Sequence, residues 1–257
     1  MKKNNPLTTS AGIPIGDNTN SLTSKSREPL FIQNWQLFEK SAHFHRQRIP
    51  EGMVHTKSTG IFGTLTIMND LTKYSKNKIF STTVKKADCF VCSSTVVEER
   101  KTADAEHDVH EFPIKIYTEE MNWNLASNNT SMFFIRDSKM NLSSNTAQRD
   151  FWSLFPESLH EDTILFSKCG LPKTSHHMNG YARHTYNLIN EKNERFWVKT
   201  IQGNPCLPDE KSIRLIGQDR KSHQLDLFYA IDKGDLPKWQ MMIHVMTDIQ
   251  AEKTIKV

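Results

Sequence analysis

Residues 181–200 read YARHTYNLINEKNERFWVKT, and they point to the architecture of this chain. The segment holds two stretches rich in aromatic and β-branched residues, YARHTYNLIN and ERFWVKT, which are typical of strands. A short polar turn at Glu191–Asn193 lies between them. Because so short a connection joins antiparallel neighbours, the segment predicts a β-hairpin.

More strands are predicted on both sides of this hairpin. Residues 60–69, IFGTLTIMND, alternate apolar residues with Thr and Gly, which is the period of a half-buried strand. Clusters of Asn, Asp and Lys separate the other candidates, as antiparallel connections require. Those candidates are residues 78–83, 88–97, 112–118, 131–136 and 238–246.

Helices are predicted before, between and after these strands. The first runs between Pro29 and Pro50, and the second lies within residues 151–166, after a polar loop at 137–149. Two more follow residue 208, and another begins at Asp248. The residues expected to share a helical face are Phe31, Trp35, Phe38 and Ala42 in the first helix, and Leu225, Phe228 and Ile231 in the fourth. The expected capping residues of the two helices after residue 208 are Asp209, Gly217, Asp219 and Gly234.

This order of elements predicts an α+β fold around an antiparallel sheet, because a parallel sheet needs strict alternation of strand and helix. Residues 1–28 are polar, with scattered apolar residues, and predict an extended N-terminal arm. Residues 29–257 then form the core domain.

Composition narrows the classes of function. Of 257 residues, 37% are hydrophobic and 24% charged, which is enough apolar material for a core. The net charge of +4 is spread along the chain and leaves no nucleic-acid footprint. No apolar run approaches the ~20 residues of a membrane helix, and no apolar stretch follows the basic start MKKNNPLTTS. A cytoplasmic protein with reduced thiols is expected.

Cys89 and Cys92 form a CxxC pair within an extended stretch. A spacing of three places the two side chains on opposite faces of a strand. No second CxxC completes a zinc site, so two ordinary strand cysteines are expected.

Two positions stand out as candidates for chemistry. His55 precedes a turn into a strand, where an imidazole can point into a barrel mouth or simply be solvated. Asn128 and Asn129 precede an apolar strand candidate, where they form a turn or orient a small polar substrate. Spacing alone does not place His55 beside Asn128.

In order along the chain, several motifs resemble the heme catalase family. They include Arg48-Ile49-Pro50-Glu51, Val54-His55-Thr56-Lys57, Tyr117-Thr118-Glu119-Glu120, Asn122-Trp123-Asn124-Leu125, Asn128-Asn129-Thr130, Pro156-Glu157-Ser158-Leu159-His160, His177-Met178-Asn179-Gly180-Tyr181 and Val245-Met246-Thr247. The resemblance covers nearly the whole chain. It implies an incomplete catalase-like antiparallel barrel with external helices.

The resemblance also implies roles for individual residues. His55 matches the distal acid–base group that moves a proton between the peroxide oxygens, and Asn128 matches the amide that orients hydrogen peroxide. Ser94 matches the hydroxyl that bonds the distal imidazole, and Phe133 a ring lining the heme pocket. Val54 matches the valine of the access channel.

The resemblance departs from the family around the iron. The family holds heme iron through a Tyr that follows an Arg by four residues. The residues four before the five tyrosines are Asp70, Pro113, His177, Ala182 and Leu225, so no proximal metal ligand is expected in this chain. His184 matches the partner of the missing Arg. Gly52 and Cys92 stand where the family has arginines on the heme propionates.

The resemblance extends to a cofactor and to assembly. His160, Ser167, Asn179 and Tyr181 match positions of a surface NADPH site, although Cys169 replaces its Arg. Many members are homo-oligomers, which is therefore the expectation here. Three functions remain open: a catalase or weak peroxidase that protects from peroxide, an inactive degenerate relative, and a heme- or partner-binding scaffold without turnover.

Overall fold

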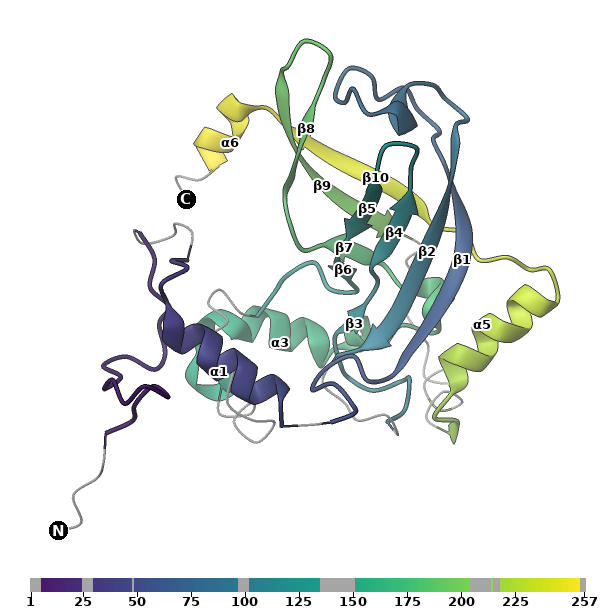
Figure 1. Ribbon diagram of the computed structural model, residues 1–257. Coiled ribbons are helices and arrows are strands. Elements are labelled where there is room, and N and C mark those ends of the chain that lie inside the picture. The colour runs from purple at the N-terminus through teal and green to yellow at the C-terminus, as the bar shows by residue number, and fades with distance from the viewer. Residues whose placement is uncertain are drawn as a thin grey trace. The chain divides into compact units, whose positions relative to one another are not determined.

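The computed structural model describes residues 6–24, 30–47, 49–96, 102–134, 151–203, 214 and 218–254. The chain divides into two compact units. One comprises Met1–Val54 and Met132–Thr163, and the other comprises His55–Ser131 and Ile164–Val257. The second unit contains the sheet (Figure 1).

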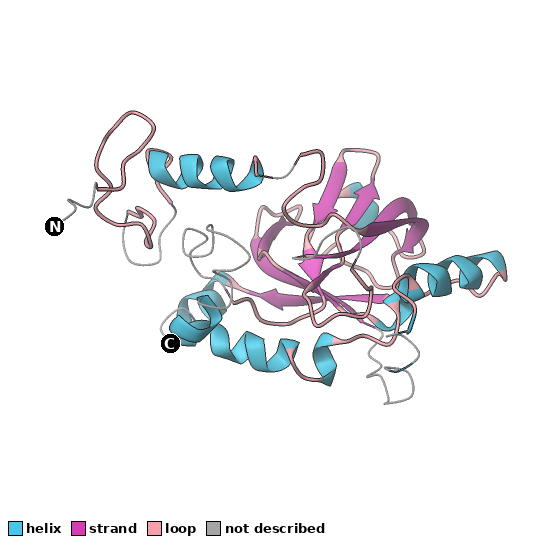
Figure 2. Cartoon of the chain, turned by 90° about the horizontal axis from the view of Figure 1, so that it is seen from below, coloured by secondary structure: helices cyan, strands magenta, loops and turns pink. Residues whose placement is uncertain are grey.

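The second unit is built on one antiparallel sheet, in which the described strands follow the order β10-β9-β7-β6-β3-β2-β4-β5, with β1 paired to β2 and β8 paired to β9. Figure 2 shows these strands in magenta as a strongly curved sheet. The α+β prediction is confirmed. The strands are β1 Ser58–Thr66, β2 Lys86–Thr95, β3 His110–Glu111, β4 Ile114–Tyr117, β5 Asn122–Leu125, β6 Ser127–Asn128, β7 Gly180–Ala182, β8 Tyr186–Ile189, β9 Arg195–Gly203 and β10 Gln240–Met246.

The predicted hairpin is present as β8 and β9, which pair from Tyr186↔Val198 to Ile189↔Arg195. Its turn is closed by Asn190, whose side-chain oxygen accepts the backbone N–H groups of Lys192 at 3.0 Å and Glu194 at 2.9 Å. Local side-chain hydrogen bonding of this kind is the reason Asn favours turns.

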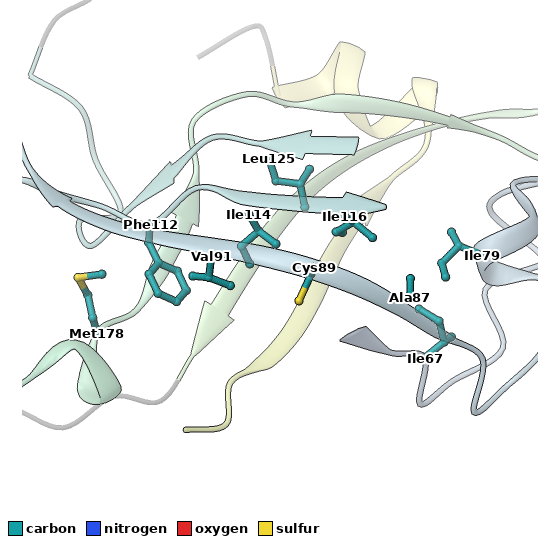
Figure 3. Close-up of a cluster of buried hydrophobic side chains, with 10 residues drawn as sticks. All are labelled: Ile67, Ile79, Ala87, Cys89, Val91, Phe112, Ile114, Ile116, Leu125 and Met178. Atoms are coloured by element: carbon teal, nitrogen blue, oxygen red, sulfur yellow. The ribbon is translucent and has the colours of Figure 1, made fainter. Parts of the chain in front are cut away.

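The core lies on one face of the sheet, because alternate residues of a strand project to the same side. Cys89 and Val91 of β2 lie opposite Ile116 and Ile114 of β4. Figure 3 shows these side chains together with Phe112. Each large apolar side chain buried here contributes about 1.5–3 kcal/mol. Cys89 faces this core as a free thiol, which confirms the prediction of an ordinary strand cysteine for this residue.

Two predicted strands are wrong. Residues 78–83 contain the short 3-10 helix η1, Lys78–Phe80, because the side chain of Asn77 accepts the backbone N–H of Ile79 at 3.0 Å and closes a turn. Residues 131–134, the described part of the other candidate, contain no strand. Both segments are apolar, and an apolar run alone does not distinguish a strand from a buried turn.

Helix α5, Ser222–Asp232, buries a different face from the predicted one. Phe228 is 61% exposed, whereas His223 and Leu227 are buried. The helix start is also capped from a distance, because Asp104 accepts the backbone N–H groups of His223 and Gln224, both at 3.1 Å. The backbone of Gly234 has φ +79°, as the predicted C-terminal cap requires.

The first unit contains helix α1, Trp35–His45, which is shorter than predicted. Leu37 is its buried residue, while Trp35 and Phe38 of the expected face are 63% and 50% exposed. Phe134 and Phe151 are buried in this unit with their ring centroids 6.3 Å apart.

The remaining described elements are the short helices η3 Pro156–Ser158, α3 Leu159–Leu165, η4 Lys168–Gly170, η5 Ser175–His177 and α6 Asp248–Thr254. The predicted loop at 137–149 lies outside the described residues, as does nearly all of the helix expected after Asp209. No described helix has the length and apolar character needed to cross a membrane.

Candidate active site around His55

A row of polar residues crosses the sheet at one level. Ser94 of β2 lies opposite Glu111 of β3, and Glu111 lies opposite Asn128 of β6. Residues directly opposite each other in antiparallel strands have Cα atoms about 4.5–5.5 Å apart and project to the same face. The row therefore brings together side chains from three separate segments, on the face opposite the apolar core.

His55 is held over this row by three hydrogen bonds. Its backbone N–H donates to the carbonyl of Val96 at 3.1 Å. Its ring Nδ1 lies 3.1 Å from Oγ of Ser94, and its Nε2 lies 3.1 Å from Oε1 of Glu111. The backbone of His55 has φ +59°, a left-handed conformation that is uncommon for a residue with a side chain. Such strain is found where surrounding contacts fix a functional group.

These contacts determine where the ring proton lies. A carboxylate only accepts hydrogen bonds, so with Glu111 ionised Nε2 of His55 must carry the hydrogen. In the neutral ring the lone pair is then on Nδ1, where it accepts the hydroxyl proton of Ser94. The geometry thus favours one tautomer of His55.

Asn128 and Asn129 have different roles, and neither forms the turn considered from the sequence. The Asn129 side-chain oxygen accepts the backbone N–H of His110 at 2.9 Å, which makes it a structural residue. Asn128 is fully buried, and its Nδ2 has no hydrogen-bond partner among the described residues. A buried donor without a partner costs about 1–3 kcal/mol, so such a group is expected to serve a ligand.

The other residues suggested by the resemblance lie apart from this row. Val54 and Phe133 belong to the first unit, where Val54 is half-buried and the Phe133 ring packs 4.8 Å from that of Phe134. His184 is exposed in the loop between β7 and β8, with its ring edge-on to Tyr186 at 6.2 Å.

Sequence reasoning missed Glu111. The residue lies in a two-residue strand that begins within a polar stretch, and nothing in its spacing from His55 indicates contact. The one available signal was its place in the motif His107-Asp108-Val109-His110-Glu111, where alternation puts Glu111 on the opposite face from His110.

A cavity of about 300 Å³ lies near this row and takes most of its lining from the alternate residues of the same strands. Thr95 of β2 lies opposite His110 of β3, and both line it together with His223 from α5. Lys57 and Asp104 close its edge with an ion pair of 2.6 Å. Burial lowers the pKa of His110 to about 3, and the nearby His223 lowers it further. Both histidines are therefore neutral at pH 7.

The predicted histidine pair of the HDVH stretch does not act together. His107 uses its Nδ1 on the carbonyl oxygen of Leu165 at 2.8 Å, whereas His110 is buried on the sheet. Within the described ranges, no three His, Cys, Asp or Glu side chains converge as a metal site. Burial raises the pKa of the Cys89 thiol, as expected of an inert thiol in the core.

Ser94, His55 and Glu111 also have the order of groups found in serine hydrolases. Two features argue against nucleophilic chemistry. Ser94 is 6% exposed. Its strand is paired with β1 on one side and β3 on the other, which engages the backbone donors that an oxyanion hole requires. The arrangement is suited to holding an imidazole and moving a proton.

Comparison with known proteins agrees with this assignment of roles. The family model described as Catalase matches residues 8–256. The chain belongs to the catalase family. A catalase of Staphylococcus haemolyticus (strain JCSC1435) is 44% identical over 269 residues, which cover 98% of this chain and 54% of that protein. A catalase of the Onchocerca volvulus endobacterium is 45% identical, with 98% and 56% covered.

Solved catalase structures have the same fold. Catalase A from Saccharomyces cerevisiae superposes with a TM-score of 0.72 at 32% identity, covering 96% of this chain and 55% of that one. A bacterial catalase gives a TM-score of 0.71 at 33% identity, covering 98% of this chain and 52% of that one. The chain thus spans about half the length of the catalases it matches.

Proposed function

We propose that His55 and Asn128 form the peroxide side of a catalase-type heme site, which decomposes hydrogen peroxide to water and oxygen. The observation that carries this proposal is the buried, unpartnered Nδ2 of Asn128, in the same cross-strand row as the serine that holds the imidazole. The catalase relatives support the substrate class.

The residues of this row fit such a site. A half-buried imidazole, held at Nδ1 by Ser94, and an amide donor without a protein partner are the groups that a small peroxide needs. Heme, when bound, supplies the iron whose oxidation breaks the O–O bond. By resemblance, Val54, Phe133 and His184 complete the surroundings of the heme.

Each polar residue has a separable task. The amide of Asn128 donates a hydrogen bond to one peroxide oxygen and orients the molecule, which is the positioning contribution to catalysis. The acid–base group removes a proton from one oxygen and delivers it to the other. Ser94 keeps the imidazole from rotating, since its hydroxyl occupies Nδ1.

The iron ligand is the part that these 257 residues do not supply by resemblance. None of the five tyrosines follows an Arg by four residues. Tyr74 instead packs its ring against Phe196 at 5.2 Å, and Tyr229 is exposed on α5. We therefore propose that this chain by itself retains heme weakly and evolves little oxygen.

Reconstitution with hemin tests both parts. A Soret band shows whether heme enters, and an oxygen electrode then measures peroxide decomposition. Slow oxygen release that His55→Ala abolishes, and that the exposed control His244→Ala leaves unchanged, supports the peroxide-side role. Release that survives both His55→Ala and Asn128→Leu contradicts it. Rapid release by the unmodified chain contradicts the proposed lack of an iron ligand.

A further inference from the structure

Glu111 occupies the centre of the polar row. Its Cα lies opposite Ser94 on one side and Asn128 on the other. Its carboxylate reaches Nε2 of His55 at 3.1 Å and remains partly open, since 37% of the side chain is exposed. Glu111 is thus the only member of the row that neighbours both His55 and the strand of Asn128.

The contact with His55 changes which group can accept a proton. With Nε2 carrying the hydrogen that Glu111 accepts, and Nδ1 turned to the hydroxyl of Ser94, neither imidazole nitrogen has a free lone pair. The remaining lone pairs of the Glu111 carboxylate are free to accept from a bound molecule.

Spacing along the row leads to the same group. Two steps across the sheet separate Ser94 from Asn128, a Cα distance of about 10 Å, whereas one step of about 5 Å separates Glu111 from Asn128. A peroxide hydrogen-bonded to the buried amide of Asn128 therefore meets the carboxylate before it meets the ring held by Ser94.

We propose that Glu111 takes the proton from a small neutral hydroperoxide held by Asn128, with His55 as its hydrogen-bond partner. This inference rests on the proposed function of the same row. In the step, the O–H bond of the peroxide breaks and its electron pair stays on the peroxide oxygen. A new O–H bond forms on the Glu111 carboxylate, and Nε2–H of His55 stabilises the carboxylate before transfer and holds the acid in place after it.

The same charge selects the substrate class. An ionised carboxylate next to the binding position repels anions in a partly desolvated site and accepts hydrogen bonds from neutral acids. The site is therefore suited to neutral, protonated molecules such as hydrogen peroxide or hydrogen cyanide, and unsuited to azide or fluoride.

The first test needs no heme. In protein labelled with ¹⁵N-histidine, two-bond ¹H–¹⁵N correlation spectra report which ring nitrogen is protonated, and His55→Gln assigns the signal. We expect the Nε2–H form of His55 at neutral pH. It should persist in Glu111→Gln, whose amide oxygen still accepts, and be lost to a mixture of tautomers in Glu111→Leu. An Nδ1–H tautomer in the unmodified chain, or no change in Glu111→Leu, overturns the inference.

The second test follows hydrogen cyanide binding to hemin-loaded protein by the Soret shift. This neutral acid must lose its proton on binding, and loss of the group that accepts it slows association by at least about 100-fold. We expect that loss in Glu111→Gln and no change in the exposed control Glu119→Gln.

The possible results separate the two proposals. A 100-fold loss in His55→Gln with none in Glu111→Gln makes His55 the base, so that the proposed function stands and the inference about Glu111 fails. No loss in either variant contradicts both. If hemin is not retained, the proposed function fails, and the tautomer of His55 alone decides whether Glu111 holds its proton.

Discussion

His110 and His223 lie with their ring centroids 6.2 Å apart, although one comes from β3 and the other from the start of α5. They are 3% and 5% exposed, and in the described part of the chain Nε2 of each ring has no partner. Two imidazoles buried this close cannot both be charged at modest cost. Their neutral state is therefore part of the folded structure.

We predict that acid destabilises the protein through this pair. Burial lowers the pKa of both histidines below the ordinary value of about 6.5, against the opposing effect of Asp104 and Asp226 on His223. The unfolded chain therefore binds more protons than the folded one below pH 6.5. Stability present above that pH is lost as the pH falls towards 4, by about 2–4 kcal/mol between pH 7 and pH 5.

Urea unfolding at pH 7 and pH 5 measures this loss. The double variant His110→Gln/His223→Gln should show a much smaller difference between the two pH values. His244→Gln, which removes an exposed histidine, should keep the full difference. A pH dependence that the double variant retains assigns it to other groups.

The ion pair between Lys57 and Asp104 predicts a large effect of removing the carboxylate. Both side chains are largely buried, at 15% and 12% exposed, and Asp104 also caps α5. Asp104→Ala leaves a buried ammonium without its partner and should destabilise the fold by about 3–5 kcal/mol. Asp104→Asn keeps an acceptor for the helix and should cost less.

The matched control for this change is the Lys85–Glu119 pair, in which Glu119 is 64% exposed. Glu119→Ala should cost at most about 1 kcal/mol. Chemical denaturation of the three variants gives the comparison, and equal losses for Asp104→Ala and Glu119→Ala would refute the prediction.

Asn128 is expected to lower stability in exchange for its binding role. Asn128→Leu removes a buried donor without a partner and should leave stability unchanged or raise it by about 1–2 kcal/mol. Asn129→Leu removes the acceptor of a buried backbone N–H at His110 and should destabilise by about 1–3 kcal/mol. Thermal unfolding of both variants distinguishes them, and a clear loss in Asn128→Leu would show that its amide is bonded within the protein.

Gly180 of β7 leaves no room for a side chain. A Cβ there would lie 2.2 Å from the side-chain oxygen of Gln202 and 2.7 Å from the Phe112 ring, both fully buried. Gly180→Ala should therefore destabilise by about 1–3 kcal/mol. At Gly63 of β1 the nearest atom is Sγ of Cys89 at 3.6 Å, an ordinary contact, so Gly63→Ala should change the unfolding free energy by less than about 0.5 kcal/mol.

Local sequence pattern was sufficient for the parts of this fold that depend on near neighbours. Alternation predicted β1 and β2, and the Asn-containing turn predicted the β8–β9 hairpin, because both depend on contacts within a few residues. It was insufficient where an apolar run had no clear period, as at residues 78–83. It also failed for the buried face of α5, which depends on what the helix packs against.

For the candidate site, motif resemblance identified His55, Ser94 and Asn128, since these residues keep their order and neighbours along the chain. It did not identify the carboxylate on His55, the cap that Asp104 provides for α5, or the unpartnered amide of Asn128. All three depend on strand register and chain crossings between segments distant in sequence. A period of two residues assigns a side chain to a face, but the residue that lies opposite is decided by long-range pairing of β2, β3 and β6.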